Sequence, residues 1–517
     1  MRPTDDLFDL IKSLEKSEKR TFSLYASRHV RGDANNYQKL FDAIDTQSVY
    51  DESLIKEKLS GESFVKHYAF AKNYLYRLIL RSLNSAQAAA SPNRLLMEHL
   101  QFADTLYQKG LYAQCLKIIW KAKEMAEKYE RLHLLLDIIR WELKLYTVAP
   151  GIFADQKFKV NVYRHEEETL KKLQNLNRYG QLSAELYTRS VRVGGMIRTP
   201  RERQQFVRFM RHPLLQKEDN ALSYEAMEYF YYLHALYNSL REDMEESWRY
   251  RKAQADLIEA HPAVIEWEPR RYIFTLGNLM IAELYLHKRS DFFTSLQKIR
   301  SLVSRSPGTE SLVFSVSYLR EINFYKSHAE FQKGISLTDK IREGIEKHGK
   351  EMPDTVLLEY YFELFSVHFP MGKFKEALHW LNALFNHPGR DSRQDLQSVA
   401  RLCALITHFE LGNPEIIEPM LRSTYRYLVR CKRIYRTESI LLEFIRKNLF
   451  RPLADDALLS AFRQLRKALA PMEQDPFEKL LFEYFDFAAW LDGKISGTLF
   501  VEILRQKVLF NERNRET

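Results

Sequence analysis

Apolar residues recur every three or four positions along almost the whole chain of 517 residues. In the segment 95–107, for example, Leu96, Leu100, Ala103 and Tyr107 follow this spacing, which places them on one face of a helix. Extended runs in which apolar and polar residues alternate are absent, and no Asn-Gly or Asp-Gly pair joins two such runs. The pattern predicts an all-α protein.

Three segments carry the residue types with which helices begin. Residues 199–202 (Thr-Pro-Arg-Glu) predict a capping box with a proline in the first turn. Residues 475–478 (Asp-Pro-Phe-Glu) predict a second box, and Asn413 before Pro414 predicts a third capped start. Each capping side chain would accept a hydrogen bond from backbone N–H groups that a helix leaves unpaired at its start.

A helix–turn–helix pattern around Gly372 recurs along the chain. Gly372 predicts a tight turn, Ala377 is a small residue where the second helix approaches the first, and Pro388 ends that helix. The same offsets return at Gly110 and, five positions later, at Cys115. A unit of two helices joined by a short turn is therefore repeated.

The predicted turns from residue 291 onward are 38 to 43 residues apart, a period of about 40. They are Asp291, Ala329, Gly372, Gly412, Asp455 and Gly493, and Glu242 is an earlier one. At these residues the chain resembles the tetratricopeptide repeat family, whose usual period is about 34 residues. The resemblance implies a right-handed α-solenoid of antiparallel helix pairs, with longer helices than usual. Together with its first 90 residues, the chain also resembles bacterial proteins with such repeats that have no assigned function.

Shifts in composition divide the chain into four parts. They are 1–90, an N-terminal helical bundle or cap; 91–150, the first repeat-like helices; 151–220, an irregular helical segment; and 221–517, the helical repeat array. A linker rich in Ser and Ala, residues 85–94, ends the first part. Glycines and prolines gather in the third part, where we expect an extended connection near 193–199.

The composition excludes several classes of protein. Hydrophobic residues make up 45% and charged residues 28%, which is typical neither of a disordered chain nor of a membrane protein. Three cysteines cannot form a disulfide scaffold, so we expect reduced thiols. Asp5 and Asp6 stand where a secretory signal would need an apolar run, and we expect a cytoplasmic protein. The net charge of +10 is mild for this length and permits an acidic partner without requiring one.

The sequence carries none of the common enzyme signatures. It has no phosphate-binding loop, no GxGxxG, GxSxG or HExxH motif, and no CxxC pair. The acidic stretch after His165 is best interpreted as a solvated helix face, on which Glu167 and Glu168 pair with Lys171 and Lys172. We therefore expect no catalytic residues, no metal ion and no cofactor.

Two basic clusters exceed the background. The first comprises Arg189, Arg192, Arg198, Arg201, Arg203, Arg208, Arg211 and Lys217. The second is a stripe at helical spacing formed by Arg422, Arg426, Arg430 and Arg433. Arginine forks pair well with phosphate, so such a stripe could follow a nucleic-acid backbone. A solvated helix face is the alternative interpretation.

A second candidate surface follows from the resemblance, because first helices of tetratricopeptide repeats line a concave groove that binds peptides. Mapped onto this chain, the groove residues would be Tyr229, Tyr232, Asn278, Tyr285, Lys288, Asn323, Lys326, Phe362 and Phe369. Their polar members could hold the backbone or a carboxylate of a peptide, and the rings its side chains. For any one aromatic residue, a place in the core is the alternative.

Three functions agree with these patterns. The leading hypothesis is a non-enzymatic interaction scaffold that binds a peptide or protein segment in the groove. The second is a nucleic-acid- or ribosome-associated adaptor that uses the arginine stripes, whose binding should weaken steeply with salt. The third is a peptide-sensing regulator, with the N-terminal 90 residues as its effector module.

Overall fold

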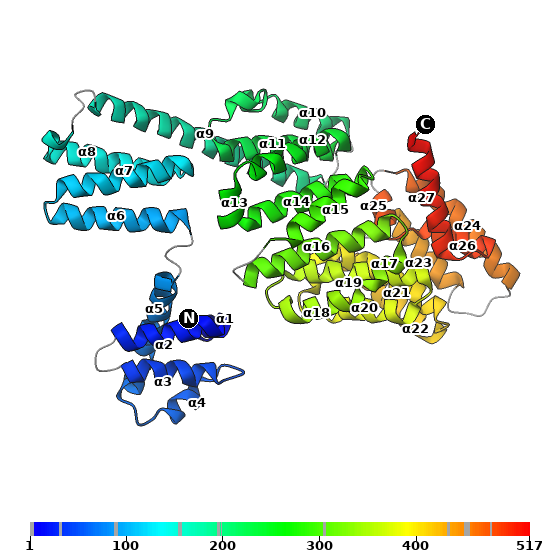
Figure 1. The fold of residues 1–517 in the computed structure, drawn as a ribbon. Coiled ribbons are helices and arrows are strands. Elements are labelled where there is room, and N and C mark those ends of the chain that lie inside the picture. Colours follow the sequence, from blue (N-terminus) through cyan, green and yellow to red (C-terminus); the bar gives the residue numbers. More distant parts are fainter. Residues whose placement is uncertain are drawn as a thin grey trace. The chain divides into compact units, whose positions relative to one another are not determined.

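A computed structural model describes residues 5–29, 34–86, 91–153, 158–193, 197, 199–302, 307–431, 435–448, 455–475 and 478–516. These residues form 27 α-helices and no strand, which confirms the all-α class (Figure 1). None of the described helices combines the length and the apolar character that crossing a bilayer requires. The chain divides into two compact units, residues 1–174 and 175–517.

The first unit begins with a helical bundle that has its own core. Its helices are α1 (Asp6–Ser13), α2 (Lys16–His29), α3 (Ala34–Asp45), α4 (Glu52–Lys58), the short 3-10 helix η1 (Ser63–His67) and α5 (Tyr68–Ala86). The core residues that these helices share include Ile11, Phe22, Leu40, Ile44 and Leu75, all fully buried. These helices and the core that they share lie within residues 5–86.

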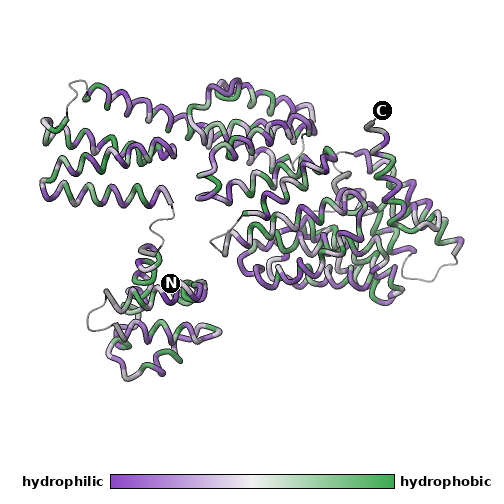
Figure 2. Tube along the Cα trace, viewed as in Figure 1, coloured by the Kyte–Doolittle hydropathy of each residue, from purple (hydrophilic) through white to green (hydrophobic). Residues whose placement is uncertain are grey.

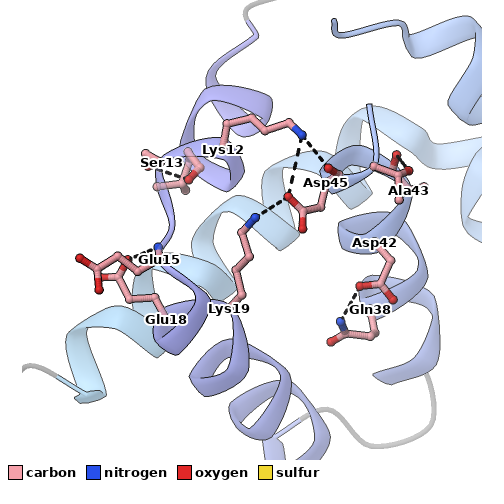
Figure 3. A network of polar contacts seen from close by, with 11 residues as sticks. Lys12, Ser13, Glu15, Glu18, Lys19, Gln38, Asp42, Ala43 and Asp45 are labelled. Carbon is pink, nitrogen blue, oxygen red and sulfur yellow. Dashed lines mark hydrogen bonds and ion pairs between the residues drawn. The ribbon is translucent and has the colours of Figure 1, made fainter. Parts of the chain in front are cut away.

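Asp45, the last residue of α3, joins three helices of this bundle at the surface (Figure 3). Its carboxylate lies 2.6 Å from the Lys19 ammonium on α2, and its backbone carbonyl accepts a hydrogen bond of 2.6 Å from Lys12 on α1. These side chains are partly exposed, so each ion pair contributes at most about 1 kcal/mol. The network links the three helices at the surface of the bundle.

Three antiparallel helices and the first half of a fourth complete the first unit. They are α6 (Pro92–Gln108), α7 (Tyr112–Lys128) and α8 (Leu132–Val148), followed by η2 (Pro150–Ile152) and α9 (Phe158–Arg192). Cys115 is fully buried between α6 and α7, with its Sγ 3.2 Å from the carbonyl of Ala103. The small residue predicted five positions after Gly110 therefore lies where the two helices approach each other.

The second unit contains the second half of α9 and eighteen further α-helices, most of them packed against the next in sequence. Its first members are α10 (Pro200–Met210), η3 (Pro213–Leu215), η4 (Glu218–Asn220), α11 (Tyr224–Leu240), α12 (Met244–Glu259), α13 (Pro262–Trp267), α14 (Pro269–Tyr285), α15 (Arg289–Arg300), α16 (Pro307–Ser327), α17 (Phe331–Ser336) and α18 (Thr338–His348). Figure 2 shows hydrophilic and hydrophobic residues mixed within nearly every helix, as amphipathic helices require.

The remaining members form the C-terminal part of this unit. They are α19 (Asp354–His368), η5 (Phe369–Met371), α20 (Phe374–Asn386), η6 (Arg390–Arg393), α21 (Gln394–Glu410), α22 (Pro414–Arg430), α23 (Arg436–Asn448), α24 (Asp455–Glu473), α25 (Lys479–Tyr484), α26 (Phe487–Ser496) and α27 (Phe500–Glu516). One hydrophobic cluster extends from α16 to α27. Helices far apart in sequence therefore share a core here.

The turns within the helix pairs of this unit have a common geometry. One residue adopts a left-handed conformation, and the N–H of the next residue donates to the carbonyl five positions earlier, as at Lys288 and Glu283 (2.8 Å). The left-handed residues are Glu242, His287, Ala329, Gly372 and Gly412, at intervals of 40 to 45 residues. Four of these turns were predicted. The prediction at Asp291 is wrong, because that residue lies inside α15 and the turn is at His287.

Two further turn predictions have different outcomes. Gly493 is buried inside α26, and the left-handed glycine is Gly497, at the end of that helix. The predicted turn at Gly493 is therefore wrong by four residues. Asp455 begins α24, but residues 449–454 before it lie outside the described part of the chain.

The predicted helix starts have three different outcomes. Thr199 and Glu202 form the capping box, with reciprocal hydrogen bonds of 3.0 and 3.2 Å. Helix α22 begins at Pro414 as predicted, but the Asn413 side chain accepts no capping hydrogen bond from its backbone N–H groups. Residues 476 and 477 lie outside the described residues, and the carboxylate of Glu478 instead accepts hydrogen bonds from the first residues of α23.

The segment 151–220 is more regular than expected, because α9 alone is a helix of 35 residues within it. The division between the two compact units falls inside α9, after Gln174. Of the connection predicted near 193–199, residues 194–196 and 198 lie outside the described part. Ile197 is described, and its N–H donates to the carbonyl of Leu240 at 2.9 Å.

Candidate binding sites

A pocket of about 280 Å³ lies between α9, α11, α12 and α14, and we call it the α11–α14 pocket. It is lined by Ser183, Glu225, Glu228, Tyr229, Tyr232, Gln254, Arg271, Phe274, Thr275 and Asn278. Three of these, Tyr229, Tyr232 and Asn278, are residues that the sequence places in a groove. The structure therefore brings together one third of the predicted groove residues, from two helices more than 40 positions apart.

Helical spacing explains why these side chains converge. On α11, Glu225, Glu228 and Tyr232 are three and four positions apart, which aligns them on one face. On α14 the same holds for Arg271, Thr275 and Asn278. Both helices begin with strong signals, because the Ser223 side chain caps α11 and Pro269 occupies the first turn of α14.

Acidic groups outnumber basic ones at this pocket. The Arg271 guanidinium lies 3.3 to 3.4 Å from carboxylate oxygens of Glu225, Glu228 and the neighbouring Glu268. Burial raises the pKa of Glu228 to about 7, because the charge of Arg271 only partly offsets the loss of solvent. One carboxylate oxygen of Glu228 is buried and has no hydrogen-bond partner among the described residues. This oxygen is the one that lies 3.3 Å from the Arg271 guanidinium, so it is ion-paired and can still accept a hydrogen bond from a ligand in the cavity.

The remaining polar residues predicted for the groove are mostly engaged within the chain. The Lys326 ammonium is 2.6 Å from a carboxylate oxygen of Glu363 on α19. The Lys288 ammonium lies 4.2 Å from the ring centroid of Trp248 and 3.8 Å from the carboxylate of Glu245. These contacts join successive helix pairs, so both lysines have a structural role. Asn323 is half-buried, and Tyr285 at the end of α14 is exposed.

The assignment of Phe362 and Phe369 to an open groove is wrong, because their side chains are only 1% and 2% exposed. The ring of Phe362 packs against Tyr484 at a centroid distance of 5.9 Å. Phe369 packs against Phe485 and Phe500 at 5.2 and 6.0 Å. The chain's own residues 484–500 therefore cover this face of α19 and η5.

Polar contacts fasten the same covering segment to α21. The Trp490 indole N–H donates to the carboxylate of Glu410 at 2.7 Å, and the Lys494 ammonium binds its other oxygen at 2.6 Å. The Tyr484 hydroxyl donates to the carboxylate of Asp395 at 2.8 Å. Three anchor points from α25 and α26 thus lie along α21, roughly 80 to 90 residues earlier in the sequence.

A larger cavity, of about 980 Å³, lies between the second half of α9 and α10, and we call it the α9–α10 cleft. Its lining includes five arginines: Arg178, Arg189, Arg192, Arg208 and Arg211. Four of them belong to the first basic cluster of the sequence. Arg178 was missed, although it precedes Arg189 by eleven positions, which is three helical turns on the same face. Arg198 of that cluster lies outside the described residues.

The second basic cluster has a different setting. Arg422, Arg426 and Arg430 are exposed on one face of α22, as their spacing predicts, while Arg433 lies outside the described residues. Arg422 forms an ion pair with Glu418, and the Arg430 guanidinium lies 5.3 Å from the Tyr427 ring centroid. This stripe is an open helix surface, in contrast to the two walls of the α9–α10 cleft.

Groups that could support metal chemistry are not assembled in the described part of the chain, where no three His, Cys, Asp or Glu side chains form a metal-binding cluster. The acidic stretch after His165 is a helix face, on which Glu167 forms an ion pair of 2.8 Å with Lys171.

No protein-family model, no curated protein and no solved structure matches the chain. The geometry of its pockets is therefore the basis for a functional assignment.

Proposed function

We propose that the protein is a non-enzymatic interaction scaffold, a right-handed α-solenoid of tetratricopeptide-like helix pairs that binds a protein segment on its first helices. The convergence of Tyr229, Tyr232 and Asn278 on the α11–α14 pocket carries this proposal. The recurring left-handed turns, 40 to 45 residues apart, support the repeat class. Preorganised helices hold such a site without a loop that must be ordered on binding.

The chemistry of the α11–α14 pocket favours a basic side chain in the partner. Three carboxylates surround one guanidinium, so a lysine or arginine entering the pocket would restore the balance of charge. The exposed ring of Phe274 and the rings of Tyr229 and Tyr232 can contact the same cation through their faces. The Asn278 amide can bind the backbone of the segment.

Peptide selection tests this proposal. Random peptides displayed on phage are selected against the full chain, and we expect enrichment of peptides with a lysine or arginine at one fixed position. In the variant Glu228→Gln, the selected peptides should bind about tenfold more weakly, because a charged hydrogen bond contributes about 1.5–3 kcal/mol.

The matched control is Glu418→Gln, which removes the same charge from the exposed face of α22. This variant should bind the selected peptides as the original protein does. Enriched peptides without a basic residue, or equal losses in both variants, would contradict the proposal.

A further inference from the structure

The α9–α10 cleft has cationic side chains on both of its walls. Along α9, Arg178, Arg189 and Arg192 are eleven and three positions apart and therefore share one face. Arg208 and Arg211 stand on the opposite wall, at the end of α10. Two helices that are adjacent in sequence thus aim their arginines into one space.

The positive charge of this cleft is largely uncompensated. Among the described residues of the lining, Glu185 is the only acidic one, and it is paired with Arg189 at 2.6 Å. Arg192, Arg208 and Arg211 are exposed and form no ion pair with any carboxylate that the structure describes. Concave surfaces with charge of one sign concentrate ligands of the opposite sign.

His212 also lines the cleft, and its pKa responds to both the burial and the charge of its surroundings. Burial lowers the pKa of this imidazole, and the positive charge of Arg178 lowers it further. The carboxylate of Glu185 opposes this effect without reversing it. Burial is the main cause of this pKa shift, and only the contribution of Arg178 reflects the positive charge of the cleft.

The size and lining of the cleft narrow the choice of anion. From Arg178 to Arg192 the α9 wall extends for 14 residues, or about 21 Å, which is long enough for several consecutive phosphates. Between the arginines the lining is mixed: Thr188 and Gln205 are polar, and the apolar members Leu182, Phe206 and Phe209 present only small edges because they are 2 to 8% exposed. A ligand that alternates phosphates with flat, partly polar groups matches this mixed lining.

We propose that the α9–α10 cleft binds a single-stranded nucleic-acid segment. The phosphates pair with the guanidiniums of Arg192, Arg208 and Arg211, and the bases lie against the mixed lining. A duplex keeps its bases stacked inside and would meet only the rim. A polyacidic peptide would satisfy the guanidiniums but would bring no flat group to the polar and apolar edges between them. This site is separate from the α11–α14 pocket, and its occupant differs from the peptide proposed there.

The test measures binding of the full chain to a fluorescein-labelled 12-nucleotide RNA of mixed sequence, by fluorescence anisotropy over a range of salt concentrations. The triple variant Arg192→Ala, Arg208→Ala and Arg211→Ala should bind about 30-fold more weakly at 100 mM salt. For this variant, the slope of log affinity against log salt concentration should decrease in magnitude by about 2, because each of the three phosphate contacts contributes about 0.7.

The matched control is the triple variant Arg422→Ala, Arg426→Ala and Arg430→Ala, which removes the same charge from an open helix face. It should change the affinity by less than threefold. All six arginines are exposed, and circular dichroism will verify that both variants fold. Glu228→Gln should leave RNA binding unchanged, which separates this site from the proposed peptide site.

Competition identifies the class of ligand. Unlabelled single-stranded RNA or DNA of the same sequence should displace the probe at least tenfold better than a duplex or a poly-glutamate of equal charge. Equal competition by poly-glutamate would assign the cleft to acidic peptides and overturn the proposal. Equal losses in the two triple variants, or no binding of the probe at 50 mM salt, would also overturn it.

Discussion

Two regions of the second unit are built from the same kind of helix pair, but the surface of one is accessible and the surface of the other is covered. At α11 and α14, the first helices of their pairs line an accessible pocket. At α19 and α21, also first helices, the equivalent expectation fails because residues 484–500 cover Phe362 and Phe369. The same local pattern thus yields a surface that is open in one region and filled by the chain itself in the other.

The side chains of the two regions explain this difference. The covered region carries the phenylalanines Phe362, Phe365 and Phe369, which pack on Tyr484 and Phe485 and would form a large apolar patch if left open. The open region carries charged and amide groups among its aromatic rings, including Glu228, Arg271 and Asn278, so it leaves no large apolar patch that a cover would have to bury. The polarity of the side chains therefore determines the outcome: a polar first-helix surface can stay accessible, whereas an apolar one is buried by another part of the chain.

The largest expected effect comes from removing a central side chain of residues 484–500, the segment that covers α19. Phe485 is 6% exposed and packs on Phe365, Phe369 and Phe500. Phe485→Ala should lower the free energy of unfolding by about 3–5 kcal/mol, because it leaves a cavity between the cover and α19. Urea unfolding monitored by circular dichroism measures the loss, and binding of a hydrophobic dye should increase.

The control for this variant is Phe510→Ala on α27, where the side chain is 64% exposed. It should alter the free energy of unfolding by no more than about 0.5 kcal/mol. Similar losses at both positions would show that the C-terminal helices do not form a specific cover.

In the open region, the raised pKa of Glu228 should make the stability of the protein depend on pH. Burial raises the pKa of Glu228 from 4.5 to about 7, so the folded state holds this proton over a range in which the unfolded state has released it. The ionised carboxyl therefore destabilises the fold increasingly from pH 4.5 to 7, and the full cost remains above pH 7. A shift of 2.5 units corresponds to about 3 kcal/mol.

Glu228→Gln removes this titration, so the stability of the variant relative to the original protein should rise by up to about 3 kcal/mol between pH 4.5 and 7.5. Urea unfolding at several pH values measures the difference. A constant difference across this range would mean that Glu228 is ionised at low pH and that the pocket is wetter than its burial implies.

The two regions also show how far sequence patterns predict structure. Helical periodicity predicts the all-α class and most turns, because both depend on neighbours within a few positions. The turn at His287 was predicted four residues too late, at Asp291, because histidine marks a left-handed position far less clearly than glycine does at Gly372. The convergence of Tyr232 and Asn278 followed from repeat geometry, whereas the burial of Phe362 depends on Tyr484, more than 100 residues later. Local sequence patterns cannot predict burial by residues that are so distant in sequence.

The smallest expected effects concern the turns that close the two first helices. Glu242, after α11, has a φ of 63°, and Gly372, after α19 and η5, has a φ of 69°. A non-glycine residue is strained in this conformation, so Glu242→Gly should stabilise the protein by about 0.5–1 kcal/mol. Gly372→Ala should destabilise it by about 1 kcal/mol, and no atom lies within 4 Å of the added Cβ, so the cost is that of the backbone alone.

Thermal unfolding of both variants, measured side by side, compares the turns directly. Effects of opposite sign and similar size would indicate that the two turns are equivalent and that the regions differ only in what covers them. If Gly372→Ala instead costs more than about 3 kcal/mol, the turn is coupled to the packing of Phe369, three residues before it, on the covering segment. The closure of the α19 surface would then depend on its turn as well as on its phenylalanines.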